Sequence, residues 1–117
     1  MQYINNTELL GVVGNIRKKN VGSAVVATVQ LTTQRTYTAK DQPTVENAWH
    51  LVTLWDKDGS LGADNLKAGD VIHVTGHIRY RKYISADGVE KIATEIHAGT
   101  CQVCDMNGES LEPAISF

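Results

Sequence analysis

The chain has 117 residues, a length that suits a single domain. Its composition is 42% hydrophobic and 21% charged, and no apolar run approaches the roughly 20 residues that a membrane-spanning helix needs. The net charge of −2 argues weakly against nucleic acid, but all 11 basic residues and 10 of the 13 acids lie in residues 1–104, which are therefore nearly neutral. No segment resembles a secretory signal, so we expect a cytoplasmic protein without a membrane partner.

Five segments are predicted to be β-strands because apolar and polar residues alternate along them. They are residues 8–16, 24–33, 48–55, 70–83 and 89–104. Within the fourth, Gly76 indicates a bulge that bends the strand. Ala86-Asp87-Gly88 is a hairpin turn signal between the last two strands.

The connections between these strands are polar. Residues 34–47 contain Pro43 and are expected to form a long loop or a flexible hairpin. Residues 60–67 are compatible with one or two helical turns, capped by Ser60 and stopped by Gly69. Residues 105–117 carry three acids and no base and are expected to be a short, mobile acidic tail. Five strands with a short helix between the third and the fourth predict an all-β fold, a Greek-key barrel of the OB type, over residues 1–104.

The two tryptophans of the chain, Trp49 and Trp55, lie six residues apart in the third strand. This even spacing places both rings on one face of an extended strand, while Val52 and Leu54 point to the other face. An exposed apolar face usually marks a contact surface, although buried rings or a subunit interface are alternatives.

Cations accompany these rings in neighbouring segments. Arg79, Arg81 and Tyr83 share one face of the fourth strand, and Arg35 and Tyr37 begin the polar segment. Flat rings stack on bases at about 1–3 kcal/mol per base without regard to sequence, and basic side chains neutralise phosphates. Because bases in a duplex are not accessible to such rings, this set favours single-stranded nucleic acid.

Several motifs, in order and with matching spacing over residues 8–104, resemble the bacterial single-stranded DNA-binding protein (SSB) family. LGVVGNI at residues 10–16 resembles the family's L-V-G-N-L, and AWHLVTLW at 48–55 resembles E-W-H-x-V-x-L/F. GHIRYRKY at 76–83 resembles G-x-L-x-x-R-x-W/Y, and ATEI at 93–96 resembles the closing T-E-V strand. VQLTT at 29–33, running on to Tyr37, is also similar.

This resemblance implies sequence-independent binding and protection of single-stranded DNA in replication, recombination or repair, at the nucleoid and without a cofactor. The family's stacking aromatics fall on Tyr37, Trp49, Trp55 and Tyr83, and its basic contacts on Arg79, Arg81 and Lys82. Family members usually form homotetramers, so a symmetric homo-oligomer is expected, either a tetramer or a dimer. The His of the family's W-H motif, which is associated with subunit contact, falls on His50. Tyr80 has the opposite parity from Arg81 and is expected in the core or at a subunit interface.

The C-terminal segment departs from the family pattern. Family members usually continue through a long linker to several acids followed by Ile-Pro-Phe, whereas here residues 111–117 follow the barrel closely. Ile115 and Phe117 retain an Ile-x-Phe ending. The resemblance implies that this ending is a docking tail for replication and repair proteins. A primosome-type or mobile-element adaptor, acting mainly through protein contacts, is therefore an alternative function.

Other motifs point more weakly to chemistry. Cys101-x-x-Cys104 is one half of a usual zinc site, and positions three apart on a strand face opposite sides. His73 and His77 share a strand face but lie about 13 Å apart at strand rise, too far to chelate one ion. No nucleophile–base set is present, so we expect neither a metal site nor an enzyme. Arg17-Lys18-Lys19 fits a solvated turn, with phosphate contact as the alternative.

Overall fold

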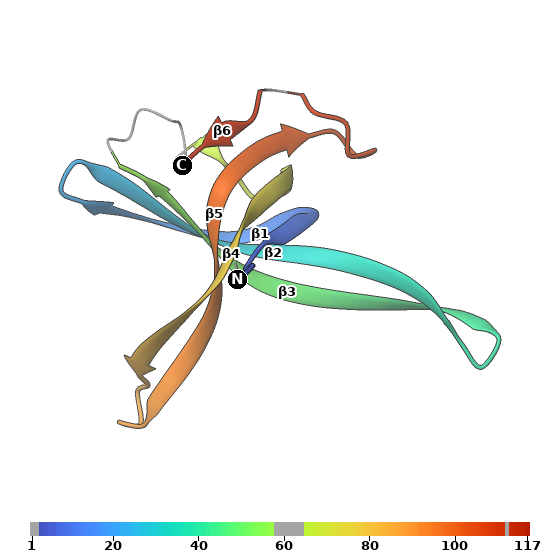
Figure 1. The fold of residues 1–117 in the computed structure, drawn as a ribbon, viewed down its shortest axis with the longest axis horizontal. Coiled ribbons are helices and arrows are strands. Elements are labelled where there is room, and N and C mark those ends of the chain that lie inside the picture. The colour runs from blue at the N-terminus through green and yellow to red at the C-terminus, as the bar shows by residue number, and fades with distance from the viewer. Residues whose placement is uncertain (1–2, 58–64, 112) are drawn as a thin grey trace.

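The computed structural model describes residues 3–57, 65–111 and 113–117. Its five long strands are β1 (Thr7–Val21), β2 (Ala24–Ala39), β3 (Gln42–Asp56), β4 (Val71–Ile84) and β5 (Glu90–Cys104), followed by the short β6 (Ile115–Ser116). The sheet order is β3-β2-β1-β4-β5-β6, and a parallel pairing of β3 with β5 closes the first five strands into a barrel. The predicted all-β, five-stranded OB-type barrel is confirmed (Figure 1).

The core forms from the alternating apolar residues of the predicted strands. On β2, Ala27, Val29 and Leu31 are fully buried, and Val29 pairs with the equally buried Val52 of β3. Leu66, in the connection between β3 and β4, is also buried and packs against this core. The buried cluster comprises Val13, Ala27, Val29, Leu31, Val52, Leu54, Leu66, Ile72, Val74, Ile96, Ala98 and Cys101.

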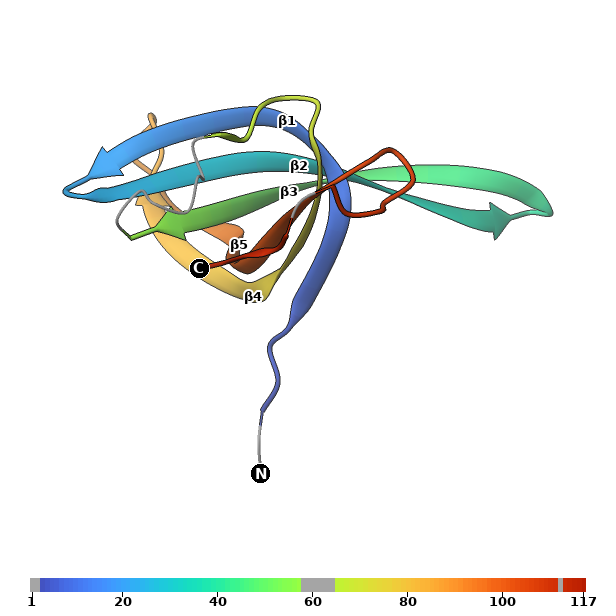
Figure 2. The same ribbon diagram turned by 90° about the horizontal axis from the view of Figure 1, so that it is seen from above.

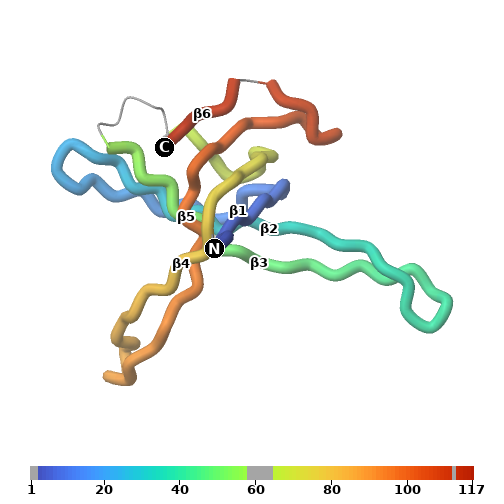
Figure 3. Tube along the Cα trace, viewed as in Figure 1, coloured from blue at the N-terminus to red at the C-terminus, as the bar shows by residue number. Residues whose placement is uncertain are grey.

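Two hairpins project from the barrel. The β2–β3 hairpin extends to one side and the β4–β5 hairpin to another (Figures 1 and 3), and the view from above shows the β2–β3 hairpin reaching well beyond the barrel strands (Figure 2). Of the two alternatives predicted for residues 34–47, a long loop or a hairpin, the structure shows the hairpin: a regular two-stranded ladder that turns at Lys40 and Asp41, both with positive φ. Pro43 is tolerated in β3 because that part of the strand lies at the sheet edge, where a missing N–H breaks no second ladder.

Two bulges set the register of the barrel. The pairing of β1 with β2 shifts between Val13 and Ile16, and the pairing of β4 with β5 shifts between Thr75 and Gly76. The second shift falls at Gly76, where a bulge was predicted, but the extra residue is Gly99 of β5 and not a residue of β4, because Thr75 pairs with Thr100 and Gly76 with Ala98. A Cβ at Gly76 would lie 2.1 Å from the backbone oxygen of His97, so only glycine allows the two strands to approach this closely.

The segments outside the barrel differ in part from expectation. Residues 60–64 of the predicted helix lie outside the described residues; Asn65 has 3₁₀ geometry, and residues 66–67 are not helical. The predicted mobile tail is instead paired with the sheet: Ile115 pairs with Cys101 in β5, and the Phe117 N–H donates to the Gly99 carbonyl at 2.8 Å. Phe117 also packs against the core, so backbone pairing and apolar contact together hold the end of this acidic segment against the barrel.

Candidate nucleic-acid interface

The outer face of β3 carries both tryptophans. Because Val52 and Leu54 are fully buried, the alternate residues Trp49, Thr53 and Trp55 point away from the core. Trp49 is 72% exposed and Trp55 is 37% exposed, so burial in the core of this chain, the alternative interpretation of the sequence, does not apply. The strand therefore presents two rings on its solvent face.

β4 adds cations to the same outer face. Arg79 pairs with Glu95 of β5, and Arg81 and Tyr83 follow at the same parity. The Arg81 Nε donates to Glu95 Oε1 at 2.6 Å, and the Thr53 hydroxyl donates to Glu95 Oε2 at 3.2 Å. These bonds join β3, β4 and β5. Five of the eight predicted nucleic-acid contacts share the outer face of β3 and β4: Trp49, Trp55, Arg79, Arg81 and Tyr83.

A groove of about 510 Å³ lies on this face beside Trp49. Arg17 of β1 and Arg81 of β4 both line it, and its polar lining includes Thr28 and Gln30 of β2. We call it the Trp49 groove; its lining residues are Asn15, Arg17, Thr28, Gln30, Trp49, His50, Leu51 and Arg81. An exposed ring with a cation from each of two strands fits a base and its neighbouring phosphates.

Arg17 is the residue of the groove that sequence reasoning placed in a solvated turn. It pairs with Thr28 inside β1, which runs on to Val21. The bulge between Val13 and Ile16 shifts the parity of β1, so that Ile16 faces the core and Arg17 faces out with Thr28. Gly14, within the bulge, is the signal in the sequence that points to this shift.

Arg35 and Tyr37 lie on the opposite face of the β2–β3 hairpin. Tyr37 and Arg35 share the parity of the buried Leu31, whereas the partner of Trp49 is Thr32. The Arg35 guanidinium lies 4.7 Å from the centre of the Tyr37 ring, and its Nη2 atom lies 3.5 Å from the Glu46 carboxylate. This pair is a second cation–ring surface, separate from the Trp49 groove.

Lys82 and Tyr80 occupy the other face of the β4–β5 hairpin. Their parity is opposite to that of Arg81, and Lys82 Nζ lies 3.7 Å from Glu90 Oε1. Tyr80 is 69% exposed, which excludes the predicted core position and leaves the subunit interface as its prediction. His50 is half-buried and its Nε2 lies 2.7 Å from the Thr33 hydroxyl within the same chain; its role in subunit contact stays a prediction.

The histidines form pairs and not a metal cluster. The rings of His77 and His97 lie 5.2 Å apart across β4 and β5, and burial, followed by the charges of His77 and Arg79, lowers the pKa of His97. His73 Nε2 lies 2.8 Å from Glu8. Across the described ranges, no group of three or more His, Cys, Asp or Glu side chains is placed to hold a metal ion. Cys101 and Cys104 are both buried as free thiols.

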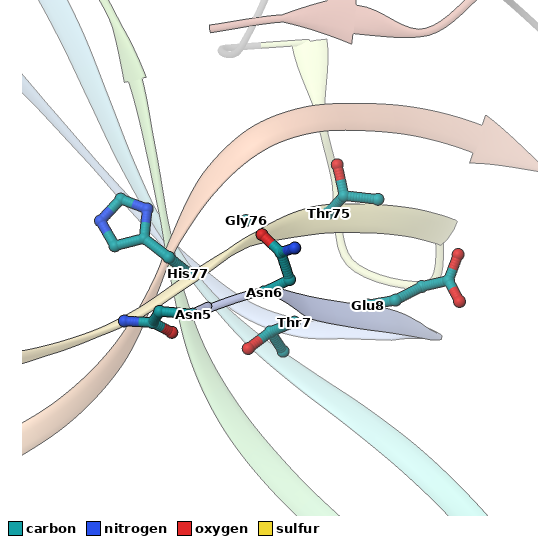
Figure 4. Close-up of a pocket in the computed structure, with 7 residues that line it drawn as sticks. All are labelled: Asn5, Asn6, Thr7, Glu8, Thr75, Gly76 and His77. Carbon is teal, nitrogen blue, oxygen red and sulfur yellow. The ribbon is translucent and has the colours of Figure 1, made fainter. Parts of the chain in front are cut away.

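A second depression, of about 680 Å³, lies where the start of β1 crosses β4. Figure 4 shows Glu8 and His77 at its two ends, with Asn6 and Thr75 between them. The Asn5 side chain closes one end by bonding both the N–H and the carbonyl of Ile78, at 3.0 and 2.9 Å. This lining includes an acid and no Lys or Arg, so the depression suits phosphate less well than the Trp49 groove.

Comparison with known families identifies the chain. It matches the family described as "Single-strand binding protein family" over residues 4–104, and it belongs to that family. A single-stranded DNA-binding protein of Xanthomonas campestris pv. campestris is 32% identical over 109 residues, covering 91% of this chain and 63% of the relative. One from Xylella fastidiosa is 34% identical over 103 residues, covering 86% and 63%. The chain thus spans slightly less than two thirds of the length of these relatives.

Solved structures support the same fold. The Plasmodium falciparum SSB in complex with ssDNA superposes with a TM-score of 0.69 at 26% identity, covering 83% of this chain and 88% of that one. A deletion mutant of the single-stranded DNA-binding protein from Thermus aquaticus gives a TM-score of 0.75 at 21% identity, over 95% of this chain and 55% of the other, and shows the fold alone. In the described part of the chain, no helix is long and apolar enough to cross a membrane.

Proposed function

We propose that this protein binds single-stranded DNA with little sequence preference, through the barrel domain of residues 1–104. Bases stack on Trp49, Trp55 and Tyr83, while Arg17, Arg79 and Arg81 neutralise phosphates. Stacking and charge neutralisation need no covalent chemistry, so the protein acts as a binder and not as an enzyme. Family membership and the names of the relatives support this function.

The observation that carries the proposal is the position of Trp49. A tryptophan exposed over 72% of its surface is unfavourable in water, and here it borders a groove with an arginine from each of two other strands. A base that stacks on the ring gains about 1–3 kcal/mol and places its phosphates within reach of both cations. The groove therefore offers the two interactions that single-stranded binding requires.

The second surface, of Arg35 and Tyr37, extends the DNA path. Because it lies on the other face of the β2–β3 hairpin, a long strand reaches it by passing around the hairpin edge. Lys82 serves the same path on the back of the β4–β5 hairpin. Such wrapping would protect single strands during replication, recombination or repair, in the cytoplasm at the nucleoid.

A homo-oligomer, tetrameric or dimeric, is part of the proposal. Leu10 and Val12 lie on the outer face of β1, 47% and 43% exposed, and Tyr80 is 69% exposed on β4. Apolar side chains on an outer sheet face favour contact with a second copy. Light scattering with and without a long oligo-dT measures the assembly size and the wrapping together. A monomer under both conditions would contradict this part.

The adaptor function has weaker support. Ile115 pairs in β6 and Phe117 packs against the core, so neither residue is presented as an open docking peptide. Replication or repair partners that use this tail would have to displace β6. Deleting residues 115–117 tests this: loss of partner binding with intact DNA binding favours a docking tail.

Tryptophan fluorescence tests the main proposal. Titration with oligo-dT should quench the emission of Trp49 and Trp55, and log affinity should fall with log salt by about 0.7 per phosphate contact. A duplex of the same length is the control and should quench far less, because its bases are inaccessible. Folded protein that shows no quenching at low salt would refute single-stranded binding.

A further inference from the structure

Glu95 is an acid at the centre of a face that otherwise carries cations. It lies on β5 between the tryptophans of β3 and the arginines of β4, and only 8% of its surface is exposed. A carboxylate at this place opposes phosphate binding by simple charge repulsion. Burying it also removes its hydration, so its presence calls for specific partners.

Both carboxylate oxygens are engaged. Oε1 accepts from Arg81 Nε at 2.6 Å, and Oε2 accepts from the Thr53 hydroxyl at 3.2 Å. The first is a charge-assisted bond of the strong class. Glu95 uses only the Nε of Arg81, and 57% of the arginine side chain is exposed, which leaves the terminal nitrogens for a ligand.

The partners of Glu95 are themselves fixed by the barrel. Thr53 pairs with His97 in the short parallel seam between β3 and β5. The second partner, Arg81, has its guanidinium 6.0 Å from the centre of the Tyr83 ring. Arg81 of β4 contacts Glu95, and Glu95 in turn contacts Thr53 of β3, the strand that carries Trp49. Arg81 also lines the Trp49 groove.

The exposed ion pair of Arg35 and Glu46 provides a contrast. There the acid and the base are 52% and 66% exposed, and the contact uses a terminal nitrogen of the arginine at 3.5 Å. Exposed pairs of this kind hold a side chain weakly. The buried acid at Glu95 restricts one arginine to one orientation, which the exposed pair does not.

We propose that Glu95 is a positioning residue for DNA binding: it holds the guanidinium of Arg81 at the rim of the Trp49 groove, with the terminal nitrogens aimed at phosphate. This role rests on the proposed function of the groove. The Arg81 side chain is then ordered before DNA binds, so the entropy cost of ordering it does not reduce the affinity. The acid strengthens DNA binding, although its own charge opposes the ligand.

The variant Glu95→Gln separates positioning from bare electrostatics. It keeps the shape and removes one negative charge, so charge alone predicts tighter binding to oligo-dT and a steeper salt dependence. Positioning predicts the reverse: affinity about fivefold weaker, because a charge-assisted bond becomes a neutral one. The slope of log affinity against log salt should also become shallower, by up to about 0.7, as one phosphate contact is lost.

A double-mutant cycle with Arg81→Met isolates the pair. Glu95→Gln should weaken binding in the wild-type background and change it less than about twofold in the Arg81→Met background. Glu8→Gln is the matched control, since it removes an acid that lies away from the groove and should not weaken binding. Thr53→Val should weaken binding in the same direction, and Thr53→Ser, which keeps the hydroxyl, should restore it.

The outcomes are distinct. Tighter binding by Glu95→Gln overturns the proposal in favour of charge repulsion, and equal weakening in both backgrounds overturns it in favour of a purely structural role. If Glu95→Gln fails to fold, as thermal melting would reveal, the Thr53→Val and Thr53→Ser pair decides the question by the same criteria. If the wild-type protein does not bind oligo-dT, the proposed function itself fails, which is a separate result.

Discussion

Trp49 and Tyr37 lie on opposite faces of one hairpin. Trp49 pairs with Thr32 and Tyr37 with Thr44, and positions 32 and 37 of β2 have opposite parity. A short, straight DNA strand cannot stack on both rings at once. Binding therefore divides into a groove contact and a contact behind the hairpin, which substitutions can separate.

Trp49→Ala should weaken binding of an oligo-dT of about five nucleotides roughly tenfold, since one stacked base is lost. Tyr37→Ala should change that affinity less than twofold but weaken binding of a strand several times longer. Fluorescence anisotropy of end-labelled oligonucleotides measures both. Equal losses on the short strand would contradict the two-face arrangement.

Arg17→Met should reduce the salt dependence of oligo-dT binding by about 0.7 in slope, because Arg17 lines the groove and the proposed function gives it one phosphate contact. Lys18→Met is the matched control. Lys18 carries the same charge as Arg17, but it pairs with Ala27 and therefore lies on the other face of the β1–β2 ladder. The slope from a salt titration is the measurement. A larger effect of Lys18→Met would show that the other face of the β1–β2 ladder, and not the groove, contacts the DNA backbone.

Gly76→Ala should destabilise the fold by about 2 kcal/mol or more, because the new Cβ meets the His97 carbonyl and the strands must separate. Gly14→Ala provides a comparison, with its Cβ 3.4 Å from the Gln30 oxygen, and should lose less. Urea denaturation followed by circular dichroism gives both values. Similar stability of the two variants would refute the close approach at Gly76.

Replacing Lys40-Asp41 by Asn-Gly should stabilise the protein by about 1 kcal/mol. Both residues have positive φ, 50° and 60°, which Asn and Gly adopt with less strain in a two-residue hairpin turn. The urea midpoint should rise without a change in slope. An unchanged midpoint would mean that the tip of this hairpin unfolds before the barrel.

Cys101 should be protected as a thiol in the folded protein. Burial, followed by the nearby Cys104 and Asp70, raises its pKa to about 11 from 9.0, so the folded state favours the neutral thiol. The resulting stability is present below pH 9 and lost as the pH rises towards 11. Stability measured across this window should fall less in Cys101→Val. Rapid labelling of Cys101 in native protein at pH 8 would contradict the burial.

The core could be predicted from the sequence because it depends on the local alternation of apolar and polar residues along each strand. Val29, Leu31 and Val52 fall on the buried face that their spacing predicts. The motifs also pointed to the aromatic and basic side chains of β3 and β4, whose contact with DNA stays a prediction. Strand ends were less predictable: polar residues 34–47 extend the hairpin because pairing with a neighbouring strand, and not hydrophobicity, holds them.

Which of the predicted side chains share one face of the site depends on the register of strand pairing, which the sequence does not show. Tyr37 and Lys82 were expected to join Trp49, but counting along a strand does not tell which face of a projecting hairpin meets the barrel surface. Arg17 was expected in a solvated turn, with phosphate contact as the alternative, because the sequence pattern did not show that β1 continues past its bulge to Val21. Glu95 was not singled out, since its role depends on Thr53 and Arg81, which approach it from two other strands.

The parallel seam between β3 and β5 also bears on the order of folding. Among the described residues, two pairs form across it, Val52 with Ile96 and Thr53 with His97, over a sequence separation far longer than that of any hairpin in the barrel. The contiguous β1–β2–β3 meander is complete early in synthesis, whereas the seam waits for β5. Closing so long a loop is entropically costly and slow. We therefore expect seam closure, and with it the assembly of Thr53, Glu95 and Arg81, to be a late event, so that a nascent or partly folded chain lacks a finished DNA-binding face.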